Sequence, residues 1–379
     1  MCKGLKALIL AGGYATRLRP LSCSNPKLLF PVVGVPLIDH MVSWLEEAGI
    51  DDVILAVNHL SDKLRIEIGE SRRDSKITFS IEENPLGTAG PVRLAKDLLE
   101  DEPFVVVNGD IVSDINLKLM IRSHTENDAK ATVSLAKVPD ARPYGTAEMN
   151  DSGRITKFEE KPNKRKSQAI NAGVYVLDPS VIQLIPPAIP SSMENMVFPK
   201  LVQDGGIWGW KHTGYWYDIG TIPEYLRANK ELLTRFHSGS PSKIREHEGT
   251  SLSRQPESAN HTSGSQLLQH PSQLVGTHYE AIVKQPSYVG EGSVLHRGAT
   301  LGPGAILSRG VAIDVGTSVR DSIIFEHTSI GRDCNVDGAI IGERVTIGSG
   351  TRIGRGAIIA GEVNIPGHSL IKQKAIILN

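Results

Sequence analysis

A pair of glycines followed by three basic side chains is the part of the sequence with the clearest chemistry. The apolar run at the start of the chain leads into AGGYATRLRPLSCSNPKLLFPV at 11–32. Because Gly12 and Gly13 have no Cβ, the backbone N–H groups of their turn can come close to a phosphate. Three fixed cations follow in the same segment: Arg17, Arg19 and Lys27. The segment is neither a Walker A motif nor G-x-G-x-x-G, and it predicts a phosphate-binding site of another kind.

Short apolar segments separated by stretches of helix length predict the framework that positions this turn. The expected strands lie at 6–11, 53–57, 103–109, 131–138 and 170–178. The expected helices lie at 38–48, 61–71 and 90–99. Wholly apolar strands of this kind are typical of a parallel sheet covered on both faces. We therefore predict one Rossmann-like α/β unit over 1–234.

A six-residue repeat dominates the C-terminal part. Aliphatic residues recur at every sixth position, with a slip of one after 319 and after 336: Val289, Leu295, Leu301, Leu307, Ile313, Val319, Ile324, Ile330, Val336, Ile341, Ile347, Ile353, Ile359, Ile365 and Ile371. A glycine often follows the aliphatic residue. This period predicts a triangular parallel β-helix of about five coils over 282–379. A β-sandwich would instead require alternation with a period of two.

Composition narrows the class of protein. Residues 235–281 are rich in Ser, His, Gln and Pro, which predicts a flexible polar linker. The 41 Lys and Arg nearly balance the 42 Asp and Glu, and this balance argues against a protein built to bind nucleic acid. No apolar run reaches the roughly 18 residues that a membrane span needs, and three cysteines are too few for a disulfide framework. We expect a cytoplasmic protein that binds neither nucleic acid nor membranes.

The glycine-rich segment resembles the sugar-1-phosphate nucleotidyltransferases, whose signature is approximately GGxGTRLxPLTxxxPKPLxPV. The matching positions are Gly12, Gly13, Thr16, Arg17, Leu18, Pro20, Leu21, Pro26 and Lys27. The sequence departs from the signature at Ala15, Ser22 and Leu28. If the loop needs a positive φ at Ala15, where the signature has glycine, the substitution costs about 1 kcal/mol.

The resemblance continues in order along most of the chain. It covers EENPLGTAGPV (82–92), NGD (108–110), FEEKP (158–162), INAGVYV (170–176) and GYWYDIGT (214–221). It implies a Rossmann-like α/β nucleotidyltransferase domain followed by a left-handed parallel β-helix. In the implied reaction, an oxygen of a sugar-1-phosphate attacks the α-phosphorus of a nucleoside triphosphate and pyrophosphate leaves.

The resemblance also implies roles for individual residues. Arg17 and Arg19 would hold the β- and γ-phosphates, Lys27 the α-phosphate region and Lys161 the sugar phosphate. Asp110 and Asp218 would hold Mg²⁺, because hard divalent cations prefer carboxylate oxygens. The remaining substrate-binding positions are Ala11, Gly12, Gly13, Glu82, Pro85, Gly87, Thr88, Gly145, Glu160 and Asn171. Among these, Gly145, Glu160 and Asn171 would bind the hexose.

The residue at position 82 bears on the choice of base. Relatives that use uracil or thymine have a glutamine five residues before the loop glycine, which is Gly87 here, whereas this chain has Glu82. A carboxylate accepts hydrogen bonds only, and guanine presents adjacent N1–H and N2–H₂ donors. The string EENPLGTAGP also resembles mannose-1-phosphate guanylyltransferases. We therefore predict transfer from GTP to mannose-1-phosphate, with thymidylyl or uridylyl transfer to glucose-1-phosphate as the alternative.

Two other functions stay open at this point. In the first, the β-helix also transfers an acyl group, for which His296, His327 and His368 are the candidate residues. In the second, the chain is a regulatory subunit that binds a nucleotide-sugar without turnover, and Ala15 is the only feature that favours it. We also expect the β-helix to assemble a homo-oligomer, because its flat faces and open ends need cover.

Overall fold

The computed structural model describes residues 4–58, 61–70, 75–99, 102–163, 169–238, 276–278 and 280–378. Most of the predicted linker, at 239–275 and 279, lies outside the described residues. Contacts divide the chain into two compact units. The first contains Met1–Thr16, Pro26–Leu29 and Ile38–Thr221; the second contains Arg17–Asn25, Phe30–Leu37 and Ile222–Asn379. The N-terminal segment therefore contributes to both units.

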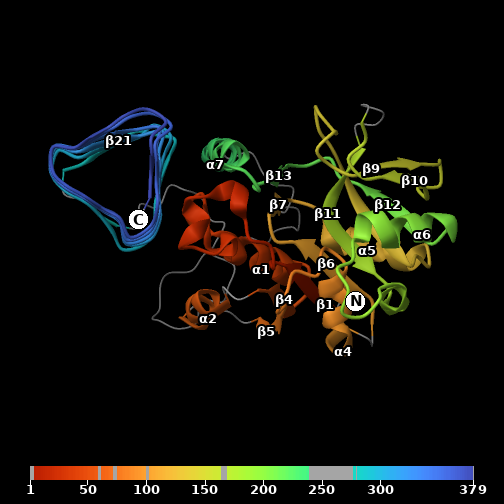
Figure 1. Cartoon of the computed structure of the whole chain (residues 1–379). Helices are drawn as coiled ribbons and strands as arrows, with labels where there is room; N and C mark the ends of the chain where they lie inside the picture. Colours follow the sequence, from red (N-terminus) through yellow and green to blue (C-terminus); the bar gives the residue numbers. More distant parts are fainter. Residues whose placement is uncertain are drawn as a thin grey trace, which may run out of the picture. The chain divides into compact units, whose positions relative to one another are not determined.

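Four parallel strands form one half of the main sheet of the first unit, in the order β6-β1-β4-β5 (Figure 1). They are β1 (Lys6–Leu10), β4 (Asp52–Val57), β5 (Lys76–Ile81) and β6 (Phe104–Asn108). The central residues of β1, β4 and β6 are wholly apolar, as is typical of strands buried on both faces, whereas the edge strand β5 also contains Thr78 and Ser80. Since the strands are parallel, the glycine turn after β1 and the NGD segment at the end of β6 lie at the same edge of the sheet.

The α-helices of this unit are α1 (Leu37–Glu47), α2 (Ser61–Glu70), α3 (Gly90–Leu94), α4 (Lys96–Leu99), α5 (Leu117–Glu126) and α6 (Phe198–Gln203). The three predicted helices are present, one of them interrupted, and α5 and α6 are helices that we did not predict. The helix predicted at 90–99 is divided at Ala95, whose backbone leaves the helical region. Among the residues that the structure describes, no helix is long and apolar enough to cross a membrane.

The second half of the sheet is antiparallel, so the wholly parallel sheet that we expected is wrong for these strands. They are β8 (Ala131–Lys137), β9 (Thr146–Met149), β10 (Ile155–Glu159), β11 (Ala169–Leu177) and β12 (Ile207–Lys211). Strand β11 runs antiparallel to β6, β8 and β9, whereas β12 is parallel to β8. The reason is connectivity: a parallel neighbour needs a long crossover, and the links from β8 through β9 and β10 to β11 are short.

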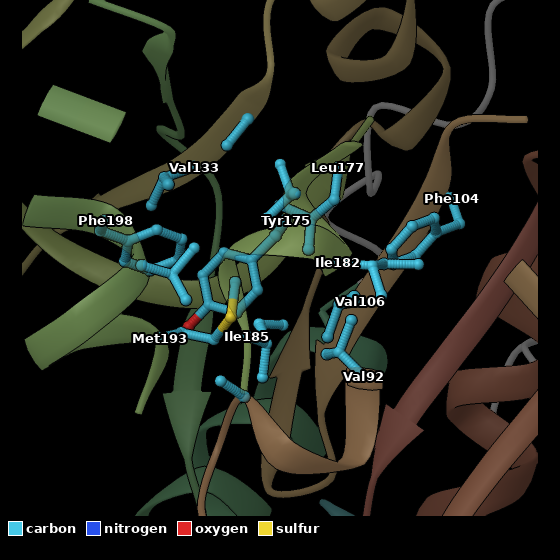
Figure 2. Close-up of a cluster of buried hydrophobic side chains, with 14 of the residues drawn as sticks. Val92, Phe104, Val106, Val133, Tyr175, Leu177, Ile182, Ile185, Met193 and Phe198 are labelled. Atoms are coloured by element: carbon cyan, nitrogen blue, oxygen red, sulfur yellow. The ribbon is translucent and has the colours of Figure 1, made fainter. Parts of the chain in front are cut away.

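A buried hydrophobic cluster joins the two halves of the sheet. Figure 2 shows Val133 of β8 and Tyr175 of β11 beside Phe198 of α6, with Phe104 of β6 at the opposite end of the cluster. Phe198 contacts the ring of Tyr175 edge-on at a centroid distance of 5.1 Å. A separate two-stranded ribbon pairs β7 (Ile111–Ser113) antiparallel with β13 (Trp216–Asp218).

The second unit contains the hairpin β2 (Pro31–Val32) and β3 (Val35–Pro36), the helix α7 (Ile222–His237) and a left-handed parallel β-helix. The β-helix consists of three six-stranded parallel sheets that form the sides of a triangle (Figure 1). The first sheet is β14 (Gly276–His278), β17 (Ser293–Leu295), β20 (Ala312–Ile313), β23 (Ser329–Ile330), β26 (Thr346–Ile347) and β29 (Asn364–Ile365). The second is β15 (Ile282–Val283), β18 (Thr300–Leu301), β21 (Ser318–Arg320), β24 (Asn335–Asp337), β27 (Arg352–Ile353) and β30 (Leu370–Ile371). The third is β16 (Ser287–Val289), β19 (Ala305–Leu307), β22 (Ile323–Ile324), β25 (Ile340–Ile341), β28 (Ile358–Ile359) and β31 (Ile376–Ile377).

The six-residue repeat has the structural meaning that we predicted. The periodic aliphatic residues form the interior of the prism, and Leu295, Leu307 and Val319 are fully buried there. Each sheet has six strands, so the β-helix has one coil more than the predicted five. The three extra strands are β14 and β15 before the recognised repeat and β31 after it.

Candidate active site

The glycine turn is held at the carboxyl end of β1 by its neighbour β4. The Ala11 N–H donates to the Ala56 carbonyl at 2.8 Å, and the Asn58 amide donates to the Gly12 carbonyl at 2.9 Å. Gly12 has no room for a side chain, whereas a Cβ at Gly13 would meet nothing within 4 Å. The backbone of Gly13 is therefore open to a ligand.

Ala15 lies in the left-handed region, with φ of +47°. The family signature has glycine at this position, and glycine adopts this conformation without strain. A residue with a Cβ in the left-handed region costs about 1 kcal/mol of stability. The strain suggested by the sequence is therefore present in the loop.

Glu82 lies directly behind the glycine turn. Its side chain is only 5% exposed, and a Cβ on Gly12 would stand 2.3 Å from Glu82 Oε1. The other oxygen, Oε2, accepts the Leu86 N–H at 3.0 Å. Burial raises the pKa of Glu82, and the bond from Leu86 opposes this effect. The carboxylate that we predict to read the base thus connects the glycine turn with the 82–88 loop.

That loop is fixed by backbone contacts with the segment around Ser191. Gly87 has φ of +77°, and a Cβ there would meet the Ser191 carbonyl oxygen at 2.4 Å, so only glycine fits. The Ala89 N–H donates to the Ser191 carbonyl at 2.9 Å, and the Ser191 N–H donates to the Leu86 carbonyl at 2.8 Å. Pro85 is exposed at the surface of this loop.

Asp110 lies in the turn directly before β7, and Asp218 is the last residue of the neighbouring strand β13. The Gly109 N–H donates to the Leu10 carbonyl at 2.9 Å, which ties the NGD turn to β1. In the ribbon, Asp218 is paired with Ile111, and the Ile219 N–H donates to the Asp110 carbonyl at 2.9 Å. The backbones of two residues that the sequence separates by more than a hundred positions are therefore adjacent, and a magnesium site shared by their carboxylates stays a prediction.

Lys27 forms an ion pair with one of these aspartates. Its Nζ lies 2.8 Å from Asp110 Oδ2, and the two side chains are 16% and 31% exposed. Asp218 Oδ1 accepts the Gly220 N–H at 2.8 Å. Within the described part of the chain, no group of three or more His, Cys, Asp or Glu could hold a metal. Two carboxylates nevertheless fit Mg²⁺, which commonly takes its other ligands from substrate phosphates and water.

The residues predicted to bind the hexose meet around Gly145. A Cβ there would stand 2.7 Å from Glu160 Oε2, so glycine is needed for the close approach. The Gly145 carbonyl accepts the Asn171 N–H at 2.8 Å. Lys161 has φ of +45°, and its Nζ lies 3.8 Å from Glu160 Oε1. The structure thus brings Gly145, Glu160, Lys161 and Asn171 together.

Aromatic side chains border this group. The Asn171 side chain donates to the Tyr175 hydroxyl at 2.9 Å and accepts the Gly173 N–H at 3.0 Å. The Trp216 indole N–H donates to the Ala172 carbonyl at 2.8 Å, and its ring is edge-on to Tyr144 at 5.4 Å.

Glu194 is a site residue that the sequence did not reveal. Its Oε2 accepts the hydroxyls of Thr88 at 2.6 Å and Ser192 at 2.8 Å, and Thr88 also accepts the Met193 N–H at 2.9 Å. Burial raises the pKa of Glu160, and the charge of Glu194 raises it further. The predicted hexose site therefore has a second carboxylate whose charge acts on Glu160, and carboxylates accept hydrogen bonds from hydroxyl donors.

Arg17 and Arg19 are exposed and belong to the second unit, so their role at the phosphates stays a prediction. His327 and His368 occupy corners of the β-helix with φ of +57° and +59°. Each histidine lies against a glycine of the preceding coil. A Cβ on Gly310 would stand 2.6 Å from Nδ1 of His327, and a Cβ on Gly350 would stand 2.5 Å from Nδ1 of His368. Their rings thus pack against the coil before them, and the acyl-transfer role of these residues and His296 stays untested.

Sequence comparison agrees with this geometry. Residues 6–235 match the family described as Nucleotidyl transferase, and residues 283–379 match the GMPPB C-terminal domain. Mannose-1-phosphate guanylyltransferase 1 of Arabidopsis thaliana is 34% identical over 367 residues, which cover 95% of this chain and 92% of the relative. The mannose-1-phosphate guanylyltransferase catalytic subunit beta of Danio rerio is 39% identical over 246 residues, which cover 64% of this chain and 68% of the relative.

Solved structures resemble the first part of the chain. A putative glucose-1-phosphate thymidylyltransferase from Bacillus anthracis is 26% identical with a TM-score of 0.56, and the match covers 59% of this chain and 94% of that one. HddC from Yersinia pseudotuberculosis, complexed with GMP-PN, is 29% identical with a TM-score of 0.53 over 60% of this chain and 99% of that one. Enzymes of the matched family generally use a divalent metal ion. The chain belongs to the nucleotidyl transferase family of enzymes.

Proposed function

We propose that the protein transfers a guanylyl group from GTP to mannose-1-phosphate, which gives GDP-mannose and pyrophosphate. The observation that supports the proposal is the ion pair between Lys27 and Asp110 at the sheet edge that also carries the glycine turn, with the backbone of Asp218 on the adjacent strand. The Arabidopsis thaliana relative that matches over 95% of this chain is named mannose-1-phosphate guanylyltransferase 1. The buried carboxylate of Glu82 supports guanine, because it offers only acceptors to the base.

The chain's contribution to the reaction is positioning and charge neutralisation. A phosphate monoester is already an anionic nucleophile, so no general base is required. The N–H groups of the turn at Gly12 and Gly13 and the guanidinium groups of Arg17 and Arg19 bind the triphosphate. Lys27 neutralises the α-phosphate region, and Lys161 holds the sugar phosphate for in-line attack.

We propose that Asp110 and Asp218 hold Mg²⁺ between them. A bound Mg²⁺ offsets the negative charge that develops on the phosphate oxygens and helps to orient them. Lys27 also orients the Asp110 carboxylate before substrate binds, because its ammonium group is already paired with that carboxylate.

The hexose is bound by the group around Gly145. Glu160 and Asn171 supply acceptors and donors for neighbouring hydroxyls, and the small Gly145 allows the ring to approach the backbone. Transfer of a thymidylyl or uridylyl group to glucose-1-phosphate is the second candidate, favoured by the name of the Bacillus anthracis relative.

One experiment tests the proposal and separates the candidates. The purified protein is incubated with Mg²⁺, each nucleoside triphosphate and each hexose-1-phosphate, and pyrophosphate release is measured. We expect the highest kcat/KM with GTP and mannose-1-phosphate. Preference for dTTP or UTP with glucose-1-phosphate would select the second candidate, and no release with any pair would indicate a regulatory subunit. Consumption of acyl-CoA would reveal the acyltransferase alternative.

We also propose a homo-oligomer assembled through the β-helix and a cytoplasmic location. Light scattering of the purified protein tests the assembly: a mass near 41 kDa would show a monomer and contradict it.

A further inference from the structure

One side of the β-helix differs from the other two in its outward-facing residues. Neighbouring residues of a strand point to opposite faces, and the strands β19, β22 and β25 of the third sheet have aliphatic residues at both positions. Leu307, Ile324 and Ile341 point into the prism. Their preceding neighbours point outward but are only 1–3% exposed: Ile306, Ile323 and Ile340. On the other two sheets the corresponding outward residues include Thr300, Ser318, Ser329 and Thr346. This apolar side is therefore a packing surface.

Three aromatic rings cover part of this side. Phe325 follows β22 directly, and it contacts Phe30 edge-on at a centroid distance of 5.5 Å. Tyr225 of α7 lies 5.7 Å from Phe30 and 6.3 Å from Phe325. All three side chains are completely buried. We call Phe30, Tyr225 and Phe325 the aromatic cluster.

The hairpin after Phe30 is seated on the same side of the β-helix. Gly34, in its turn, has φ of +81°, and a Cβ there would stand 2.1 Å from the Tyr288 ring and 3.2 Å from the Leu307 carbonyl oxygen. Such a close approach requires glycine. The turn between β2 and β3 therefore lies directly against strands β16 and β19.

Helix α7 fixes the hairpin from a second direction. The Tyr225 hydroxyl donates to the Pro31 carbonyl at 2.5 Å. Asn229, which is 1% exposed, accepts the Val33 N–H at 2.7 Å and donates to the Tyr225 carbonyl at 3.0 Å. These bonds are buried, so breaking them on movement of the hairpin would leave polar groups without partners.

The hairpin is joined to the segment that carries the phosphate-binding cations. Arg17–Asn25 and Phe30–Leu37 belong to the same compact unit as α7 and the β-helix, and Lys27 lies between them in the chain. The two arginines proposed to bind the triphosphate are thus carried by the unit of the β-helix.

We propose that Phe325 is a positioning residue for nucleotide binding: through the aromatic cluster, the β-helix holds the segments 17–25 and 30–37 of its own unit in place. The β-helix then does more than assemble subunits, because a change in its packing displaces Arg17 and Arg19, the two arginines that we propose to bind the triphosphate. The inference rests on the proposed function only where it assigns phosphate binding to Arg17 and Arg19.

The test combines hydrogen exchange with steady-state kinetics. Phe325→Ala removes the central ring, and Phe325→Leu keeps apolar volume but loses the edge-to-face contacts. Ile341→Ala is the matched control, because it weakens the interior of the same sheet without removing a ring of the aromatic cluster. Amide exchange over 17–37 is measured without substrates, and KM is measured for the nucleotide and for the sugar phosphate.

We expect both Phe325 variants to speed exchange over 17–37 and Phe325→Ala to raise the nucleotide KM about tenfold. The sugar-phosphate KM should stay unchanged, and Ile341→Ala should alter neither readout. Unchanged exchange and nucleotide KM in both Phe325 variants would overturn the inference. Faster exchange with an unchanged nucleotide KM would instead refute the phosphate role of the arginines, and with it the link to nucleotide binding.

Discussion

The two adjacent glycines of the phosphate turn should respond oppositely to the same substitution. Neither Gly12 nor Gly13 has a positive φ, so alanine can adopt both backbone conformations. A Cβ at position 12 would stand 2.3 Å from Oε1 of Glu82 and 3.0 Å from its Cδ, whereas position 13 is open. Gly12→Ala must therefore displace a buried carboxylate, and Gly13→Ala need displace nothing.

The expected loss follows from the contacts of that carboxylate. Displacing Glu82 breaks its hydrogen bond with the Leu86 N–H, and a bond to a charged group contributes about 1.5–3 kcal/mol. We expect Gly12→Ala to lower the free energy of unfolding by at least about 2 kcal/mol. Gly13→Ala should raise it by about 0.4–1 kcal/mol, because alanine reduces the entropy of the unfolded chain.

Urea unfolding of the protein without ligands measures both effects, and a double-mutant cycle identifies their cause. In a Glu82→Ala background the obstructing carboxylate is gone, so Gly12→Ala should cost less than about 0.5 kcal/mol. Equal stabilities of the Gly12 and Gly13 variants, or an equal cost of Gly12→Ala in both backgrounds, would refute the packing of Glu82 behind the turn.

Three further changes test separate features. Ala15→Gly removes the backbone strain of an alanine at φ +47° and should raise the free energy of unfolding, measured with urea, by about 1 kcal/mol. A lower free energy of unfolding would show that Ala15 is not strained. Glu82→Gln keeps an acceptor for the Leu86 N–H but adds donors toward the base. The ratio of kcat/KM for GTP to kcat/KM for UTP, measured by pyrophosphate release, should therefore fall about tenfold. An unchanged ratio would show that Glu82 does not select the base. Burial lowers the pKa of His124 to about 4 from 6.5, so stability should fall by about 3 kcal/mol as pH drops from 6.5 toward 4. The slope should flatten in His124→Gln, measured by urea unfolding across pH; an unchanged slope would assign it to other groups.

Features with a strong local pattern could be predicted from the sequence. The six-residue period marks the interior of the β-helix because each short strand contributes an aliphatic side chain such as Leu307. Asp110 could be placed at a sheet edge because NGD ends a wholly apolar strand. The positive φ at Ala15 could be anticipated from the glycine of the family signature.

Other features depend on long-range packing that leaves no local trace. Glu194 lies far along the chain from Thr88, and only the folded loop brings the two together. The antiparallel direction of β11 depends on missing crossover helices and not on its residues. Aliphatic pairs such as Ile323 and Ile324 did carry a signal: an outward isoleucine beside an inward one indicates a covered side of the β-helix.

The central claim is that Asp110 and Asp218 act together on one divalent cation. The most direct measurement is the rate of pyrophosphate release as a function of Mg²⁺ concentration for Asp110→Asn and Asp218→Asn, with the exposed Asp204→Asn as the control. We predict that either active-site variant lowers kcat at least about a hundredfold while its unfolding midpoint stays close to that of the parent protein. The control should behave as the parent does. Turnover near the parent rate, with unchanged Mg²⁺ dependence, in either active-site variant would contradict the claim.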